Sequence, residues 1–313
     1  MVDFILPIGS GNLSIAVGLV GHGRWGQRHL ATLVQLKTEG HISELYVCDI
    51  DPGQLDALPE TVNGTFPSLT DMLREVNIDV LGIATPPDSH LLLAKQACDK
   101  GVHFLVEKPL GIDYDETVLF LDTLTPTITM VVGYLLRHHP GIMAMQEHLL
   151  AEKEKAFMNF HYKRRTQRAR PHGATPIDTL AIHALDLCSF LLGLPLAEFN
   201  LSGLTTSADS AYIELDGKDG QQAIIDVAWG AQEEVRQLTL SGAEEEMELD
   251  FGTHDLFHRQ SGIQHDATID LANEQPLYQE WRFILASVQH ESGLIYPSRE
   301  ELLDQARWLA NHR

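Results

Sequence analysis

The sequence predicts an α/β protein of two domains, a doubly wound parallel sheet followed by an α+β domain with a mainly antiparallel sheet. In the first part of the chain, short apolar runs alternate with segments of helical periodicity, which is typical of β-α-β units. In the second part, apolar and polar residues alternate with a period of two, and turn residues separate the runs. A chain of 313 residues is also longer than one core usually organises, which favours two domains.

The first domain is expected to hold five parallel strands. Each is a short apolar run, and they are expected at residues 14–20, 44–49, 79–85, 103–107 and 127–134. Helices are expected between them at residues 24–36, 68–75, 88–101 and 113–124, with a short helix after residues 51–55. Ser68 is a typical N-cap and Gly101 a typical C-cap. Strands alternating with helices form a parallel sheet through right-handed crossovers.

The second domain follows a different pattern. Helices are expected around residues 140–152, at 178–193, at 275–289 and at 298–311, and a strand is expected at 156–164. Between residues 197 and 251 the chain is expected to form successive antiparallel strands, because Asp-Gly-Lys-Asp-Gly and Ser-Gly-Ala supply hairpin turn residues. The predicted domains are 1–134, a dinucleotide-binding Rossmann domain, and 135–313, for substrate binding and oligomerisation.

Charge and composition exclude several classes of function. Forty-four acidic residues against 22 basic ones give a net charge of −22, which argues against nucleic acid or an anionic membrane as a partner. No run approaches the ~18 apolar residues of a membrane-spanning helix, and no basic region precedes the short apolar N-terminal stretch. Three widely spaced cysteines suit a reducing compartment, so a cytoplasmic protein is expected.

A glycine-rich turn is the strongest local motif. Gly21, Gly23 and Gly26 form G-x-G-x-x-G directly after a buried strand and at the start of a helix, which is the context of dinucleotide binding. The helix N-terminus between them would hold the pyrophosphate. Asp49 ends the second strand, where a carboxylate accepts hydrogen bonds from ribose hydroxyls and repels a 2′-phosphate. No Lys or Arg lies at 50–55, so NAD is expected rather than NADP.

Two further motifs lie at strand ends, where open α/β sheets bind ligands. One begins with Thr85 and Pro86 and reaches His90, and the other contains Glu107 and Lys108. Taken alone, His90 is equally compatible with a residue that only starts a helix, and Lys108 with a solvated surface lysine. The complete set of expected cofactor contacts is Gly21, Gly23, Arg24, Trp25, Gly26, Asp49, Thr85, Pro86, His90, Glu107 and Lys108.

Taken together, these motifs resemble one family from about residue 13 to the end of the chain. The chain resembles the glucose-fructose oxidoreductase and inositol dehydrogenase (Gfo/Idh/MocA) family. The segments that carry the resemblance are the glycine turn, Thr-Pro-Pro-x-x-His, Glu107-Lys108-Pro109, Tyr134 to Pro140, Ile182 to Asp186 and Gln275-Pro276-Leu277. The resemblance implies hydride transfer between nicotinamide and a sugar-like or cyclitol hydroxyl. It also implies that Lys108 binds the reacting oxygen and that the Lys108–Pro109 peptide bond is cis.

The same resemblance assigns a base and identifies a departure. His183 matches the general base, and an imidazole pKa near ~6.5 suits that role. Many relatives carry an aspartate four residues earlier, where this chain has Thr179. Asp178 is adjacent, but on an α-helix it would lie on a different face. Thr179 is therefore expected to replace the aspartate without supplying charge, which leaves open either a weaker base or a site that only binds.

A basic cluster stands out in so acidic a chain. Lys163, Arg164, Arg165, Arg168 and Arg170 follow one another within eight positions. They are expected either to pair with the protein's own acids or to bind an anionic substrate, since guanidinium groups match phosphate and carboxylate. The expected substrate contacts are Arg137, Arg165, Arg168 and His183. His138, His139, His254 and His258, the last two at helical spacing, lack accompanying ligands, so no metal site is expected.

The leading functional hypothesis is an NAD-dependent dehydrogenase of a sugar or sugar derivative, an anionic one such as a nucleotide sugar or sugar acid. Its active site is expected in the cleft between the domains. An NAD-retaining glycosidase and a non-catalytic dinucleotide- or sugar-binding regulator are the alternatives. A sheet face without helices predicts a homo-oligomer, a dimer or tetramer, formed through the second domain.

Overall fold

The computed structural model describes residues 14–149, 155–166, 174–268, 275–290 and 293–312. The chain divides into two compact units, Met1–Gly133 with Leu277–Leu303, and Tyr134–Pro276 with Asp304–Arg313. The first division lies beside the predicted boundary at residue 134. The segment Leu277–Leu303, however, packs with the first unit, although it follows the second domain in the chain and was assigned to it. Among the described helices, none is long and apolar enough to cross a membrane.

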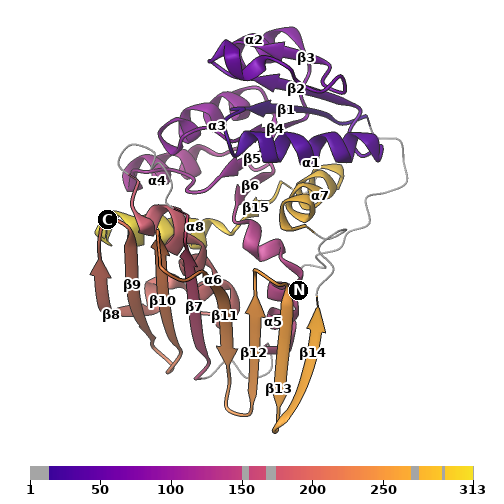
Figure 1. Ribbon diagram of the computed structural model, residues 1–313. Helices are drawn as coiled ribbons and strands as arrows, with labels where there is room; N and C mark the ends of the chain where they lie inside the picture. The colour runs from indigo at the N-terminus through magenta and orange to yellow at the C-terminus, as the bar shows by residue number, and fades with distance from the viewer. Residues whose placement is uncertain (1–13, 150–154, 167–173, 269–274, 291–292, 313) are drawn as a thin grey trace. The chain divides into compact units, whose positions relative to one another are not determined.

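The first unit contains a parallel sheet in the order β15-β6-β5-β4-β1-β2-β3 (Figure 1). Its strands are β1 (Ala16–Val20), β2 (Glu44–Cys48), β3 (Gly64–Phe66), β4 (Val80–Ile83), β5 (His103–Glu107), β6 (Met130–Gly133) and β15 (Ile295–Tyr296). All of their pairings are parallel, as predicted. The strands β3 and β15 were not predicted, because runs of three and two residues show no periodicity.

Four helices connect these strands, α1 (Gly26–Thr38), α2 (Leu69–Glu75), α3 (His90–Asp99) and α4 (Tyr114–Thr123), with short 3-10 turns η1 (Pro52–Leu55) and η2 (Pro87–Ser89). A fifth helix, α7 (Pro276–Gln289), precedes β15. Ser68 caps α2 as predicted, because its hydroxyl accepts a hydrogen bond from the Asp71 N–H at 3.1 Å. Gly101 follows α3 with φ of +72°, a left-handed conformation that ends a helix at little cost for glycine.

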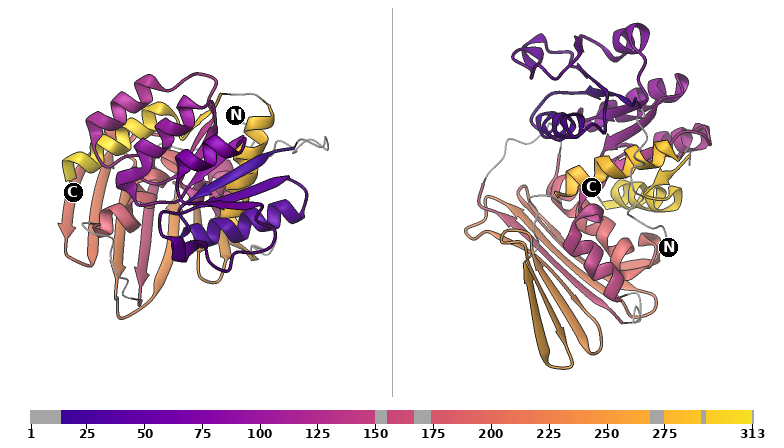
Figure 2. Two further views of the ribbon diagram at one scale, coloured as in Figure 1. Left: turned by 90° about the horizontal axis from the view of Figure 1, so that it is seen from above. Right: turned by 90° about the vertical axis from the view of Figure 1, so that its right-hand side faces the viewer.

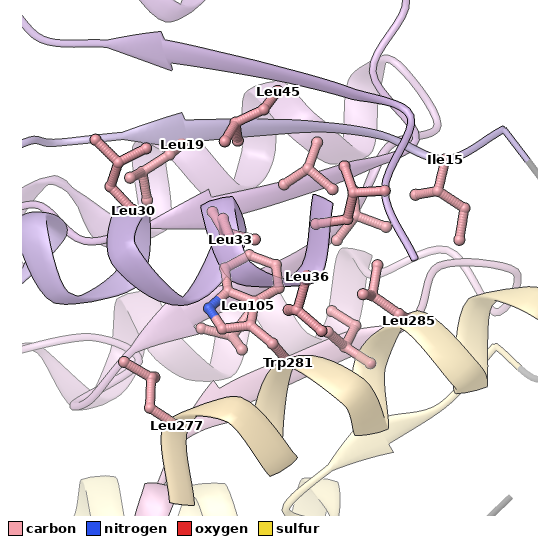
Figure 3. Packing of buried hydrophobic residues seen from close by; sticks show 14 of the residues in the cluster. Ile15, Leu19, Leu30, Leu33, Leu36, Leu45, Leu105, Leu277, Trp281 and Leu285 are labelled. Carbon is pink, nitrogen blue, oxygen red and sulfur yellow. The ribbon is translucent and has the colours of Figure 1, made fainter. Parts of the chain in front are cut away.

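Helix α7 completes the core of the first unit (Figure 3). Its buried face carries Leu277, Trp281, Ile284 and Leu285, which pack with Leu33, Leu36 and Leu105. Trp281 is fully buried, and Gly82 on β4 makes room for it. A Cβ at residue 82 would lie 2.9 Å from the indole ring, closer than carbon atoms approach in proteins. Helix α7 is therefore an integral part of the first unit.

The second unit contains an eight-stranded sheet in the order β14-β13-β12-β11-β7-β10-β9-β8. Its strands are β7 (Phe157–Arg164), β8 (Phe199–Thr206), β9 (Ser210–Gly217), β10 (Gln222–Trp229), β11 (Val235–Ser241), β12 (Glu245–Asp250), β13 (Asp255–Gln260) and β14 (Ile263–Thr268). Among the described strands of this sheet, only β7 and β10 pair in parallel, so it is mainly antiparallel as predicted. The hairpin β13–β14 was not predicted. It corrects the helical spacing suggested for His254 and His258, since His258 lies on a strand and His254 precedes that strand with φ of +66°.

Helices cover one face of this sheet (Figure 2, right). They are α5 (Pro140–Leu149) and α6 (Ile182–Leu192), and the second unit also holds the end of α8 (Arg299–His312). Short turns are η3 (Leu135–His138), η4 (Ile177–Ala181) and η5 (Leu196–Glu198). Gly193 ends α6 in the left-handed conformation, as predicted. The predicted helix 178–193 begins differently, because Ile177–Ala181 is one turn of π-helix, in which hydrogen bonds span five residues instead of four.

Candidate active site

In the turn between β1 and α1, each glycine of the motif is required for a different structural reason. Gly21 has φ of +90° and donates to the Cys48 carbonyl at 2.8 Å, which closes the turn tightly. A Cβ on Gly26 would lie 1.9 Å from the Gly21 carbonyl oxygen, so only glycine permits the helix to start there. A Cβ on Gly23 would meet nothing within 4 Å. The backbone at Gly23 therefore faces open space, where a pyrophosphate can approach.

Asp49 follows β2 and supports this turn. One carboxylate oxygen accepts the His22 N–H at 2.7 Å, and the other accepts the Asp51 N–H at 2.9 Å. A carboxylate oxygen has two lone-pair positions, so each oxygen retains capacity for a ribose hydroxyl. Ile50 beside it is 89% exposed and offers an apolar surface to an adenine ring. Together with the open backbone at Gly23, these features fit an adenine dinucleotide.

Glu107, at the end of β5, is held by two residues at the start of α1, one of which is held in turn by α7. Its carboxylate accepts the Trp25 indole N–H and a hydrogen bond from His29 Nε2 at 2.9 Å. Trp281 donates to Nδ1 of the same imidazole at 3.0 Å. Burial raises the pKa of Glu107, but the hydrogen bonds from His29 and Trp25 and the Lys108 ammonium outweigh it and hold the pKa below its ordinary value. Glu107 is thus a buried, ionised carboxylate directly before Lys108.

His29 and Trp281 were missed by the sequence analysis. Both lie within predicted helices, and nothing in the spacing of either helix distinguishes them from ordinary core residues. Trp25 was predicted to contact the cofactor, and its indole N–H is instead directed at Glu107. The glycine turn and the Glu107-Lys108 strand end are therefore joined within one unit.

The predicted cis peptide bond is confirmed between Lys108 and Pro109. His90 is placed differently from the expectation of a cofactor contact. It is fully buried, with Nδ1 at 2.8 Å from the Pro109 carbonyl oxygen and Nε2 at 2.9 Å from the Thr85 carbonyl oxygen. Its ring therefore bridges the two strand-end segments, and both of its nitrogens are used by the protein backbone. The Thr85 hydroxyl accepts a hydrogen bond from the Ser89 hydroxyl at 2.7 Å.

In the second unit, His183 lies in the first turn of α6 with the Tyr134 ring edge-on at 6.5 Å. Thr179 lies in the π turn, and its hydroxyl donates to the Thr175 carbonyl at 2.8 Å. The Asp178 carboxylate accepts the Thr175 hydroxyl at 2.8 Å. The π turn ends at Ala181, so Asp178 lies within it and His183 follows it in α6. The Asp178 carboxylate also accepts the Thr175 N–H at 3.1 Å, so it is directed toward Thr175.

Arg137 is also placed differently from the expected substrate contact. It is 2% exposed and forms a two-pronged ion pair with Asp186, at 2.9 Å through Nε and 2.8 Å through a terminal nitrogen. Gln305 donates to the same carboxylate at 2.6 Å, and the guanidinium lies over the Phe190 ring. A buried pair of this kind holds η3 to α6, because removing either partner would leave an uncompensated charge.

The basic cluster divides into two kinds of residue. Lys163 pairs with Asp226, and Arg164 pairs with Glu234 at 3.4 Å. These two residues therefore follow the expectation that the cluster pairs with the protein's own acids. Arg165 is exposed, and its Nε donates to the Gln232 carbonyl at 3.1 Å. The other two cluster residues, Arg168 and Arg170, lie outside the described residues. Of the expected anion ligands in the described part of the chain, Arg165 is thus the one at the surface.

Two buried histidines near Arg137 are kept neutral. Burial, followed by the nearby Arg137, lowers the pKa of His138 to about 3. Burial, followed by His254, lowers the pKa of His139 to about 4. The neutral His139 ring packs edge-on against Phe251, with 5.3 Å between the ring centroids, as a core residue does.

Comparison with known proteins supports a dinucleotide enzyme. Residues 15–130 match the family described as the oxidoreductase family with an NAD-binding Rossmann fold (GFO_IDH_MocA). The chain is 26% identical over 234 residues to a UDP-N-acetylglucosamine 3-dehydrogenase of Acidithiobacillus ferrooxidans, covering 69% of this chain and 71% of that protein. It is 25% identical over 236 residues to inositol 2-dehydrogenase 2 of Paenarthrobacter aurescens, covering 70% of each.

Solved structures share the fold along the chain. The Acidithiobacillus ferrooxidans enzyme superposes with a TM-score of 0.78 at 22% identity, covering 96% of both chains. A levoglucosan dehydrogenase in complex with NADH and levoglucosan gives 0.81 at 15% identity, again over 96% of both. A 3-ketoreductase of Actinomadura kijaniata in complex with NADP gives 0.78 at 13% identity, over 95% of this chain and 96% of that one.

Proposed function

We propose that this chain, whose residues 15–130 match the NAD-binding Rossmann domain of the Gfo/Idh/MocA oxidoreductases, oxidises a hydroxyl group of a sugar derivative with NAD. One observation carries the proposal. The open backbone at Gly23, the Asp49 carboxylate and the Glu107-Lys108 segment lie at the carboxyl ends of β1, β2 and β5, which belong to one parallel sheet with β4 between β5 and β1. The carboxyl ends of such strands are where these folds bind a dinucleotide.

The proposed cofactor is NAD rather than NADP. Gly21, Gly23 and Gly26 would hold the pyrophosphate at the α1 N-terminus, and Asp49 would accept the ribose hydroxyls. A 2′-phosphate beside that carboxylate would meet like charge, and residues 50–55 contain no Lys or Arg to offset it. Bound NAD supplies the hydride acceptor.

Lys108 and His183 are the proposed catalytic residues. Oxidation of an alcohol removes a hydride from carbon and a proton from oxygen. The Lys108 ammonium would donate a hydrogen bond to that oxygen and stabilise the negative charge that develops on it. His183 would accept the hydroxyl proton as the general base. In the reverse direction the same two groups would return the proton to a carbonyl oxygen.

The proposed substrate class is an anionic sugar derivative, such as a nucleotide sugar or a sugar acid. It is supported by the relative named for UDP-N-acetylglucosamine and by the exposed Arg165, whose guanidinium matches a phosphate or carboxylate. Lys163 and Arg164 are already paired with acids of the protein, so they contribute less to this proposal.

The decisive test incubates the purified protein with NAD or NADP and a panel of sugars, sugar acids and nucleotide sugars, and follows NADH or NADPH absorbance. Steady reduction of NAD by one class supports the dehydrogenase. Release of free sugar without net NADH would identify the glycosidase alternative, in which the dinucleotide is reduced and reoxidised in each turnover. Dinucleotide binding with no turnover on any compound would identify the regulator.

We further propose a cytoplasmic homo-oligomer, a dimer or tetramer. The sheet face opposite α5 and α6 would form the contact between copies, which would be tested by light scattering during gel filtration. The three cysteines carry free thiols, with Cys48 and Cys188 buried, as a reducing compartment allows.

A further inference from the structure

Three potential metal ligands meet beside β12 and β13, near the β14 edge of the second unit's sheet. His148 lies in the last turn of α5, Glu245 begins β12, and His258 lies on β13. The Glu245 carboxylate contacts Nε2 of His258, and the ring centroids of His148 and His258 are 5.0 Å apart. One ligand atom from each residue lies within 4.8 Å of the other two.

The register of the sheet explains why these side chains meet. His258 pairs directly with Met247, and Glu245 lies two residues from Met247 on the same strand. The side chains of His258, Met247 and Glu245 therefore point to one face of the sheet. Met247 is 1% exposed, which identifies this face as the one that the helices cover. On α5, His148 follows the fully buried Met145 by three residues and therefore lies on the same side of the helix.

We propose that His148, Glu245 and His258 bind a divalent transition-metal ion of the zinc class. Two imidazoles and one carboxylate form a ligand set that zinc takes in proteins, with water in the fourth position. Tetrahedral bonds of about 2.0–2.1 Å separate ligand atoms by about 3.3 Å, so small side-chain rotations suffice from the observed arrangement. Mg²⁺ and Ca²⁺ prefer oxygen ligands and do not suit two imidazoles.

This site was not expected from the sequence, because His148 is almost one hundred residues from Glu245 and no motif joins them. A simple ion pair between Glu245 and a protonated His258 is the competing explanation for two of the three residues. That ion pair would not explain why the His148 imidazole, from α5, lies beside it. A metal ion uses all three residues and ties the end of α5 to β12 and β13.

The experiment measures zinc binding to the full chain after treatment with a chelator and its removal. Titration against a chromophoric zinc indicator should give one tight equivalent per chain. His148→Ala, Glu245→Gln and His258→Ala should each weaken that equivalent by at least about 100-fold, since loss even of a group that only orients a ligand costs about 10–100-fold. Binding should also weaken as pH falls, because protons compete for imidazole.

His265→Ala is the matched control. His265 pairs with His258 across β13 and β14, and its ring centroid lies 6.3 Å away, outside the group of three. We expect it to retain the tight equivalent. The proposal is overturned if wild type binds no tight equivalent, if the three variants bind zinc as wild type does, or if His265→Ala loses as much affinity as His148→Ala. Glu245→Gln keeps the side-chain size, so it tests the ligand set even if an alanine variant fails to fold.

Discussion

The indole N–H of Trp281 donates to Nδ1 of His29 at 3.0 Å, which joins α7 to the first helix of the dinucleotide unit. An indole only donates, so Nδ1 must accept and the ring's proton must be on Nε2. Nε2 therefore donates to Glu107 at 2.9 Å. A residue near the end of the chain thus fixes the tautomer of a histidine that orients the carboxylate beside Lys108.

Trp281→Phe should test this relationship. The variant keeps an aromatic ring beside Gly82 but leaves Nδ1 of buried His29 without its donor, which should cost about 1–3 kcal/mol of unfolding free energy. Denaturant unfolding measures this loss. Trp308→Phe, at a buried tryptophan on α8, is the control and should cost less. Equal losses in the two variants would show that the Trp281 hydrogen bond adds nothing beyond packing.

Glu107→Gln should change how stability depends on pH. The pKa of Glu107 lies below its ordinary value of 4.5 in the folded protein, so its contribution is complete above that value and is lost as pH falls through the folded-state pKa. The wild type should therefore lose unfolding free energy more steeply than Glu107→Gln below about pH 4.5. Denaturant midpoints measured between about pH 6 and pH 3 check this. Parallel curves would contradict an ionised Glu107.

Asp49→Asn should reduce the preference for NAD. The substitution keeps the side-chain shape and removes the charge that favours ribose hydroxyls and opposes a 2′-phosphate. Loss of charged hydrogen bonds typically costs about 1.5–3 kcal/mol, so the NAD dissociation constant should rise about 10–100-fold. Isothermal titration with both dinucleotides measures the change. Tighter binding of NADP than NAD by the wild type would refute the cofactor assignment.

Lys108→Ala should abolish turnover and leave dinucleotide binding largely intact. Its ammonium is proposed to act on the substrate oxygen, so the loss should appear in kcat/KM and not in the dissociation constant for NAD. Retention of more than about a tenth of wild-type kcat/KM, a loss under ~1.4 kcal/mol, would exclude a catalytic role. Lys100→Ala, at the end of α3, is the control and should behave as wild type.

Sequence patterns predicted the elements that have strong periodicity or caps. The alternation of strands and helices, the Ser68 cap, the Gly193 end of α6 and the hairpin between β9 and β10 all follow from local residue preferences. Other features depend on which segments meet in space. These are the pairing of Arg137 with Asp186, the burial of His90 and the packing of α7 in the first unit. Single-sequence periodicity carries no information on such contacts, so the sequence analysis did not predict them.

The π turn before His183 leads to the last prediction. Sequence spacing made Thr179 the replacement for the family aspartate, and the π turn carries Asp178 directly beside Thr179. The Thr179 hydroxyl donates to the Thr175 carbonyl at 2.8 Å. Because threonine supplies no charge, we propose that Asp178, the carboxylate of this turn, tunes the base.

A carboxylate near an imidazole favours the charged ring and raises its pKa. Because the base must be neutral to accept a proton, Asp178→Asn should move the acidic limb of the pH–kcat/KM profile to lower pH. Thr179→Val removes only a hydroxyl and should leave that limb in place, and His183→Ala should remove it together with most of the activity. If Thr179→Val moves the limb and Asp178→Asn does not, the base is tuned by Thr179 and not by Asp178. If His183→Ala is as active as the wild type, the proton is taken by a different group.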